Sequence, residues 1–153
     1  MTESFALPIV PRYAEVDQQG VVFNAHYLTW LDEASTAYFD HLRVPFTEFS
    51  AWGVDVQVVH AELDYFAPVR WRDAVRVVTR CESVGTTSFT LLFDVRRCGD
   101  GGQDVTAVRG RNVYVVVSTD DWTKREIPAI LREALTSVAG QGQNGGDGGT
   151  VSE

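Results

Sequence analysis

The sequence predicts a single α+β domain in which one long helix near the N-terminus is enclosed by a curved antiparallel sheet of about five strands. Three observations lead to this prediction. A helical repeat of apolar residues comes early in the chain, and several segments rich in β-branched and aromatic residues follow it, separated by short turns. The 153 residues are 44% hydrophobic and show no break in composition, so we expect one core.

The helix is predicted from Ala25 to about Arg43. Its apolar residues recur at spacings of one, three and four, and Pro45 ends it soon afterwards. Asn24 is of a residue type preferred at a helix N-cap. Large aromatic residues and alanines lie along the helix, so it needs a partner that covers more than one of its faces. A curved sheet meets this need.

The other elements follow from local sequence signals. A first strand is predicted at about Ala6–Tyr13, where Pro8 and Pro11 restrict it to an edge of the sheet. Short turn sequences separate the last three strands, which should form an antiparallel meander. A second helix should run from Pro128 to about Val138. The four later strands are predicted at about Val54–Phe66, Ala74–Ser83, Thr87–Arg97 and Val105–Ser118.

The domain should span residues 1–138, because residues 139–153 form a glycine-rich tail that has almost nothing to bury. We expect this tail to be disordered. Cys81 and Cys98 fall on different strands and should not face each other. Two buried free thiols are therefore predicted, rather than a disulfide or a zinc site.

The composition also bears on partners and location. The net charge of −8, from 21 acidic and 13 basic residues, argues against nucleic-acid binding. No apolar run approaches the roughly 18 residues that a bilayer span needs, and the N-terminal residues do not read as a signal peptide. We therefore expect a cytoplasmic protein with no membrane partner. No spacing typical of metal ligands is present, so we expect no metal site.

Asp17 is the candidate catalytic residue, since it lies in a short glycine-containing loop just before the predicted helix. A helix start offers unpaired backbone N–H groups and the positive end of the helix dipole, which can hold a developing oxyanion. A carboxylate beside such donors can be sufficient for acyl transfer from a thioester, because a thiolate leaves without a strong general acid. The alternative is structural, since Asp in such a loop often makes an Asx turn.

Two motifs carry a family resemblance. The run D-x-x-G-V-V-F at Asp17–Phe23, followed by Y-x-x-W-L-D-x-A-S-x-x-Y-F at Tyr27–Phe39, resembles the hotdog-fold acyl-CoA thioesterases of the 4-hydroxybenzoyl-CoA thioesterase type. Looser matches are L-D-Y-F-A-P at Leu63–Pro68 and S-F-T at Ser88–Thr90. The resemblance implies a hotdog fold, hydrolysis of an acyl-CoA without a cofactor, and a homodimer or homotetramer with its sites between subunits.

The resemblance also implies roles for individual residues. Asp17 would act as nucleophile or general base, and the backbone N–H at Asn24 would polarise the thioester carbonyl. Substrate would be bound by two groups of residues, one near the loop and helix start and one at the turn where the family meets the phosphates of CoA. These are Gly20, Val22, Phe23, Tyr27 and Trp30 in the first group, and Thr86, Thr87 and Ser88 in the second.

Two positions depart from the family pattern. Asn24 stands where family members carry Tyr or His, and the turn before Ser88 has no basic residue. The turn can still offer hydroxyls and backbone amides to phosphate, more weakly than arginine would. A thioesterase for acyl-carrier protein, a hotdog hydratase and a non-catalytic acyl-CoA-binding hotdog module therefore remain as alternatives.

Overall fold

The computed structural model describes residues 4–99 and 101–139. The tail predicted at residues 139–153 lies outside this part of the chain, apart from Ala139, where the last helix ends. The helices and strands in chain order are β1 (Ala6–Ile9), η1 (Tyr13–Glu15), α1 (His26–His41), α2 (Phe46–Phe49), η2 (Ser50–Trp52), β2 (Val54–Tyr65), β3 (Val75–Val84), β4 (Ser88–Cys98), β5 (Asp104–Ser118) and α3 (Ala129–Ala139).

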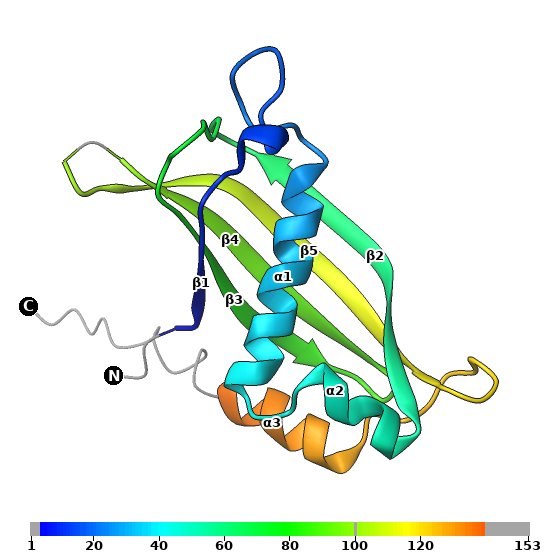
Figure 1. The fold of residues 1–153 in the computed structure, drawn as a ribbon. Coiled ribbons are helices and arrows are strands. Elements are labelled where there is room, and N and C mark those ends of the chain that lie inside the picture. The colour runs from blue at the N-terminus through cyan, green and yellow to red at the C-terminus, as the bar shows by residue number, and fades with distance from the viewer. Residues whose placement is uncertain (1–3, 100, 140–153) are drawn as a thin grey trace, which may run out of the picture.

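The five strands form one antiparallel sheet in the order β1-β3-β4-β5-β2, and α1 lies across one face of it (Figure 1). The predicted α+β class and five-stranded antiparallel sheet are confirmed. The meander is confirmed too, because β3, β4 and β5 pair consecutively. Strand β1 lies at one edge, as Pro8 within it predicts, and the much longer strand β2 forms the other edge.

Helix α1 packs closely on the sheet. A side chain at Gly110 of β5 would collide with the Leu31 side chain on the helix, so any larger residue there would force Leu31 to shift. The predicted span from Ala25 to Arg43 is longer than the observed His26–His41 by a few terminal residues. The helix buries one face against the sheet, formed by Tyr27, Trp30, Leu31, Ala34, Ser35, Tyr38 and Phe39.

The predicted N-cap was wrong. Ala25, rather than Asn24, occupies the N-cap position, and no side chain caps the helix there. The cause is a turn before the helix, in which the His26 N–H donates to the Phe23 carbonyl oxygen at 3.0 Å. This turn places Asn24 outside the helix, where its side chain cannot cap the first helical amides.

The C-terminal helix agrees with its prediction, and the cysteines agree in part. Helix α3 begins after Pro128, whose carbonyl accepts from the Arg132 N–H, as expected for proline at a helix start. Both cysteines are free thiols, as predicted; Cys81 is buried, but Cys98 is exposed at the end of β4, so its predicted burial was wrong. None of the helices in residues 4–99 and 101–139 has the length and apolar character of a membrane span.

Candidate active site

The loop before α1 is closed into a small hairpin that projects from one end of the molecule (Figure 1). A bridge between Val16 and Val22 closes it, and the Asp17 N–H donates to the Val21 carbonyl at 2.9 Å. Gly20 has a φ of +79°, a conformation that glycine adopts without strain, and its N–H donates to the Asp17 carbonyl at 3.0 Å. The loop therefore holds the Asp17 backbone in one place.

The Asp17 side chain is partly buried, and one of its oxygens is already engaged. Its Oδ1 accepts a hydrogen bond from the Gln19 N–H at 2.8 Å, which is the Asx turn considered as the structural alternative. In the described part of the chain, Oδ2 has no hydrogen-bond partner. The Asx turn fixes the orientation of the carboxylate, and one oxygen remains free to meet a substrate or a water molecule.

Asn24 lies just beyond the other end of this loop. Among the described residues, no acceptor is found for the Asn24 N–H, although the peptide is held on both sides. The Tyr65 hydroxyl donates to the Asn24 carbonyl at 3.0 Å, and the Phe23 N–H donates to the Glu15 carbonyl at 2.9 Å. A free N–H on a fixed backbone, near the positive end of α1, is the kind of donor that an oxyanion requires.

A pocket of about 290 Å³ opens next to Asn24. Burial raises the pKa of Tyr27, which therefore stays neutral near pH 7, and the Tyr27 and Tyr65 rings meet edge to face at 5.7 Å. Asp17 lies outside the pocket wall, on the adjoining hairpin. The wall is formed by Val21, Val22, Asn24, Tyr27, Tyr65, Phe66, Ala67 and Pro68.

Five of the eight wall residues, Val21 and the segment from Tyr65 to Pro68, were not predicted as site residues. The segment from Tyr65 to Pro68 belongs to the L-D-Y-F-A-P motif, which contributes to the resemblance but received no role in the site. The available signal was the pair of aromatic residues at the end of a strand. Tyr65 and Phe66 are 52% and 59% exposed, so they are not there to fill the core.

Three residues predicted to bind substrate near the loop, Gly20, Phe23 and Trp30, are not part of the pocket wall. Trp30 is buried, and its indole N–H donates to Glu15 Oε2 at 2.7 Å, while Glu15 Oε1 accepts from the Arg12 N–H at 2.8 Å. The Glu15 carboxylate therefore joins α1 to the segment before the hairpin. Phe23 is 45% exposed and contacts the His26 ring rather than the pocket.

The predicted phosphate-binding turn lies at the opposite end of the sheet. Ser88 pairs with Val115 near one end of β5, whereas Tyr65 pairs with Val108 toward the other. Thr86 and Thr87 accept hydrogen bonds there through their carbonyls, from the Ile127 and Val116 N–H groups. A single chain therefore does not bring Thr86, Thr87 and Ser88 together with Asp17.

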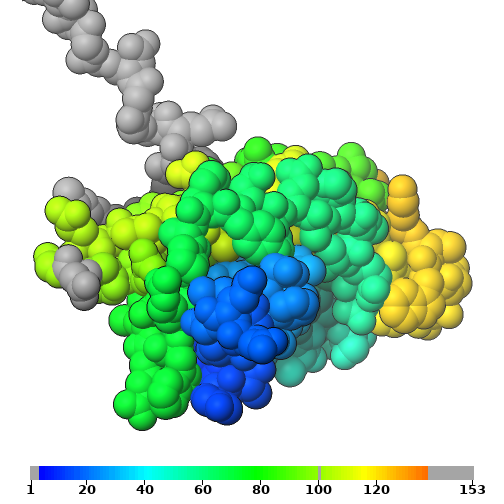
Figure 2. Space-filling model, turned by 90° about the horizontal axis from the view of Figure 1, so that it is seen from above, coloured from blue at the N-terminus to red at the C-terminus, as the bar shows by residue number. Residues whose placement is uncertain are grey.

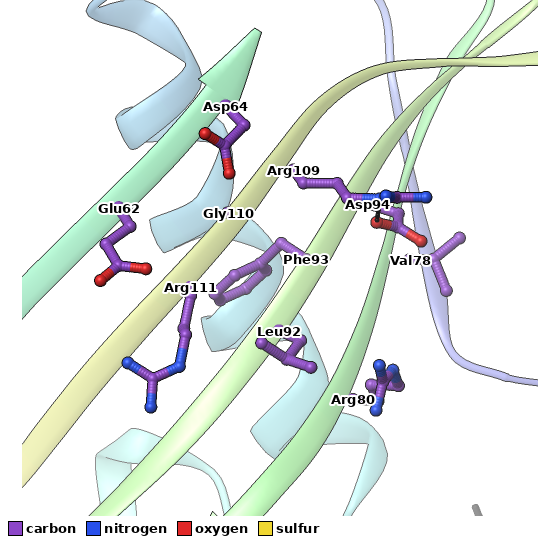
Figure 3. A pocket seen from close by; sticks show the side chains of 10 residues that line it. All are labelled: Glu62, Asp64, Val78, Arg80, Leu92, Phe93, Asp94, Arg109, Gly110 and Arg111. Carbon is purple, nitrogen blue, oxygen red and sulfur yellow. Dashed lines mark ion pairs between the residues drawn. The ribbon is translucent and has the colours of Figure 1, made fainter. Parts of the chain in front are cut away.

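A second hollow, of about 380 Å³, lies on the face of the sheet turned away from α1 (Figure 3). Cations and carboxylates alternate across it. Arg109 pairs with Asp94 at 3.3 Å, and Arg111 on the same strand pairs with Glu82 at 2.9 Å. Its charges therefore compensate one another. Across the described chain, no group of three or more His, Cys, Asp or Glu side chains is placed to hold a metal ion.

Comparison with known proteins identifies the family of the chain and agrees with its fold. Residues 11–135 match the model of the thioesterase-like superfamily. The chain belongs to this superfamily. The predicted class of enzyme, a thioester hydrolase, agrees with this membership and with the names of its relatives.

Three relatives illustrate the range. A provisionally named acyl-CoA thioesterase of Bacillus subtilis is 34% identical over 71 residues, which is 46% of this chain and about half, 51%, of that protein. The acyl-CoA thioester hydrolase YbgC of Escherichia coli is 30% identical over 95 residues, 62% of this chain and 69% of that protein. The crystal structure of a DHNA-CoA thioesterase from Staphylococcus aureus has the same fold, with a TM-score of 0.82 and 20% identity over 93% of this chain and 95% of that one.

Proposed function

We propose that the protein is an acyl-CoA thioesterase that hydrolyses the thioester to a carboxylic acid and free CoA without a cofactor. One observation carries the proposal: the Asp17 carboxylate and the unpaired N–H of Asn24 lie at the two ends of one closed loop, beside an aromatic pocket. The names of the Bacillus and Escherichia relatives support the choice of a CoA thioester.

The reaction has two routes. In the first, Asp17 takes a proton from a water molecule whose oxygen attacks the thioester carbon. In the second, Asp17 attacks that carbon itself, and water hydrolyses the resulting anhydride. In both routes the Asn24 N–H stabilises the oxyanion, and its collapse breaks the C–S bond and releases the CoA thiolate, whose conjugate acid has a pKa of about 8.5.

The acyl group would occupy the pocket beside Asn24. Val22 and Tyr27 form part of its wall, together with Tyr65 and Phe66. Gly20 shapes the loop, Phe23 adjoins the pocket in sequence, and Trp30 supports the structure from behind, at 5.1 Å from the Tyr27 ring. The aromatic wall favours an acyl chain with an aromatic ring, which is consistent with the proposed 4-hydroxybenzoyl-CoA thioesterase type.

A second copy of the chain would complete the site. Strand β2 is an edge strand in which Val58 and Val59 are 49% and 57% exposed, and such an edge is a template for pairing. If two β2 strands pair antiparallel, the Tyr65 end of one copy comes level with the Thr86–Ser88 turn of the other. We therefore propose a homodimer, or a tetramer built from dimers. Sedimentation at micromolar concentration should show no stable 17.0 kDa monomer.

A hydrolysis screen tests the proposed function. Short, long and aromatic acyl-CoAs are compared by the thiol they release, with and without EDTA, and the same acyl groups are offered on acyl-carrier protein. Release from at least one acyl-CoA, unaffected by EDTA, is expected. Release from carrier-protein thioesters alone would favour a carrier-protein thioesterase. This alternative is considered because the sequence has no basic residue at Thr86–Ser88. Binding without release would indicate a non-catalytic module.

A further inference from the structure

An exposed aromatic and basic group lies beside the pocket, and neither the proposed mechanism nor the core uses it. Tyr13 and Trp71 are 80% and 47% exposed, and their rings meet nearly perpendicular, with centroids 5.8 Å apart. The Arg72 guanidinium carbon lies 4.4 Å from the centroid of the Trp71 ring. These three residues, from two separate segments, are called the Trp71 corner below.

A tight turn presents Trp71 and Arg72. The Arg70 N–H donates to Asp73 Oδ2 at 2.7 Å, and the Asp73 N–H donates to the Arg70 carbonyl at 3.1 Å. Arg72 has a φ of +68°, a left-handed conformation that side chains other than glycine seldom adopt. The turn thus accepts backbone strain to place two large side chains at its tip, which is a feature found more often at ligand sites than elsewhere.

The turn is attached directly to the pocket. Pro68 belongs to the pocket wall, and its carbonyl accepts from Arg97 Nη1 at 2.8 Å. The next carbonyl, of Val69, accepts from the Val22 N–H at 2.8 Å, so the turn is held against the catalytic loop. Seen from above, the blue segment before α1 lies against the green segment that follows β2 (Figure 2). A ligand leaving the pocket on this side would meet Trp71.

The local charge favours an anion. Arg12 and Arg70 flank Tyr13 and Trp71 in sequence, and like Arg72 they are exposed. Among residues 4–99 and 101–139, none of these three arginines makes an ion pair. The one carboxylate in the turn, that of Asp73, is engaged by the Arg70 backbone. In a chain whose net charge is −8, this is a local gathering of free guanidinium groups.

The hollow shown in Figure 3 differs from the Trp71 corner in how its arginines are paired. Its lining also contains arginines, of which Arg109 and Arg111 are held by carboxylates of the same sheet, whereas Arg80 makes no ion pair among the described residues. Phosphate binding to Arg109 or Arg111 would have to displace an existing ion pair. At the Trp71 corner no such partner needs to be displaced, and the aromatic rings add a surface on which a base can stack.

We propose that the Trp71 corner binds the nucleotide end of CoA, with adenine stacked against Trp71 and Tyr13 and the phosphates held by Arg72, Arg70 and Arg12. The inference rests on the proposed CoA thioesterase function and extends it, because it gives the coenzyme an anchor apart from the Thr86–Ser88 turn. At that turn the Arg132 guanidinium is already engaged by the carbonyls of Gly85 and Thr86, at 2.7 and 3.3 Å. Arginine suits this role, since its planar guanidinium both stacks on rings and pairs with phosphate. The pantetheine arm would then run past Pro68 toward Asn24.

The test compares substrates that share an acyl group but differ in the nucleotide. Trp71→Ala and Arg72→Gly, the second of which also relieves the left-handed backbone, are assayed with an acyl-CoA and with the corresponding acyl-pantetheine. KM for acyl-CoA should rise about 5- to 100-fold with kcat nearly unchanged, the scale of losing one stacked base. The constants for acyl-pantetheine should stay within about twofold, and Trp71→Phe should restore most of the acyl-CoA affinity.

Trp122→Ala is the matched control, because Trp122 is also exposed and also has a left-handed backbone, at a φ of +60°, but lies in the turn after β5. It should leave both substrates unaffected. Calorimetric titration with adenosine 3′,5′-bisphosphate gives a readout independent of hydrolysis: the parent should bind it and Trp71→Ala should lose that binding. Equal losses on both substrates, an unchanged KM for acyl-CoA, or no nucleotide binding by the parent would overturn the proposal. A parent that binds the nucleotide but hydrolyses no acyl-CoA would refute the proposed function alone.

Discussion

The hydroxyl of Tyr65, at the end of β2, donates a hydrogen bond to the backbone carbonyl of Asn24, with an oxygen-to-oxygen distance of 3.0 Å. The same peptide segment presents the free Asn24 N–H to the candidate oxyanion site. A strand far along the chain therefore holds the peptide just before α1 in position. In the proposed mechanism Tyr65 is a positioning residue, because it would act through Asn24.

Removing this hydroxyl should lower kcat markedly but change the free energy of unfolding only a little. Tyr65→Phe keeps the ring against Tyr27 but loses a partly exposed hydrogen bond, which contributes about 0.5–1.5 kcal/mol. We expect kcat for an acyl-CoA to fall by about 3- to 30-fold, on the scale of a misplaced oxyanion donor, with KM changed less. Parallel kinetics and urea unfolding separate the two effects. A drop in stability with parental kcat would show that Tyr65 only supports the fold.

The Glu15 carboxylate should be a structural support of the loop. Glu15→Ala leaves the buried Trp30 indole N–H without its acceptor, which costs about 1–3 kcal/mol. Glu15→Gln retains an amide oxygen and should recover most of that loss. The free energy of unfolding in urea measures both variants. Equal stability of Glu15→Ala and the parent would mean that the bond to Trp30 contributes nothing in solution.

The close approach of α1 to the sheet at Gly110 predicts a coupled pair of substitutions. Gly110→Ala should destabilise the fold by about 1–3 kcal/mol, because the added methyl group collides with the buried Leu31 side chain. In the background of Leu31→Ala, the same substitution should cost much less. A double-mutant cycle on unfolding free energies measures this coupling. Strict additivity of the two changes would contradict the packing described.

Stability should fall at alkaline pH. Burial raises the pKa of Cys81 to about 11 and that of Tyr38 to about 12, above the ordinary values of 9.0 and 10.0 in the unfolded chain. Both groups therefore bind protons more tightly in the folded state. Their contribution is complete below about pH 9 and is lost as the pH rises through the folded values, which lowers the unfolding free energy by an amount on the order of 1–3 kcal/mol for each group.

Variants at these two positions isolate the effect. Tyr38→Phe removes a buried hydroxyl that has no hydrogen-bond partner among the described residues, so it should be neutral or stabilising at pH 7 and should flatten the alkaline decline. Cys81→Val should flatten the part of the decline that begins near pH 9. Urea unfolding at about pH 8, 9.5 and 11 checks both variants, with Cys98→Ser as the exposed-thiol control. If the free energy of unfolding of Tyr38→Phe depends on pH as that of the parent does, the Tyr38 hydroxyl does not contribute to the alkaline decline.

Elements defined by local periodicity could be predicted from the sequence. The apolar repeat of α1, the proline in β1 and the turn residues between β3, β4 and β5 act over a few positions, so the elements and the meander follow from them. N-capping is also a local signal, but the predicted Asn24 N-cap was wrong. The turn at Phe23–His26 shifts the helix start by one residue.

Contacts between distant segments could not be predicted. Glu15 meets Trp30, and Tyr65 meets Asn24, through side chains whose partners depend on how the strand and helix are placed in space. The two groups of predicted substrate-binding residues lie far apart in one chain because of the sheet topology. Antiparallel strands send the Thr86–Ser88 turn to the end of the sheet opposite the loop, and no local pattern reveals which residues a second copy would bring back.

Asp17→Asn is the measurement that tests the central claim most directly. The amide can still accept the Gln19 N–H, so the loop should keep its shape, but it can neither take a proton from water nor attack the thioester. Asp121→Asn is the matched control, because Asp121 also accepts a backbone N–H, from Thr123, but lies in the turn after β5. With an acyl-CoA that the parent hydrolyses, Asp17→Asn should lower kcat by roughly 10²–10⁴ while calorimetric affinity and unfolding free energy stay close to parental. Parental turnover in Asp17→Asn would contradict the account and leave Asp17 with only its Asx turn.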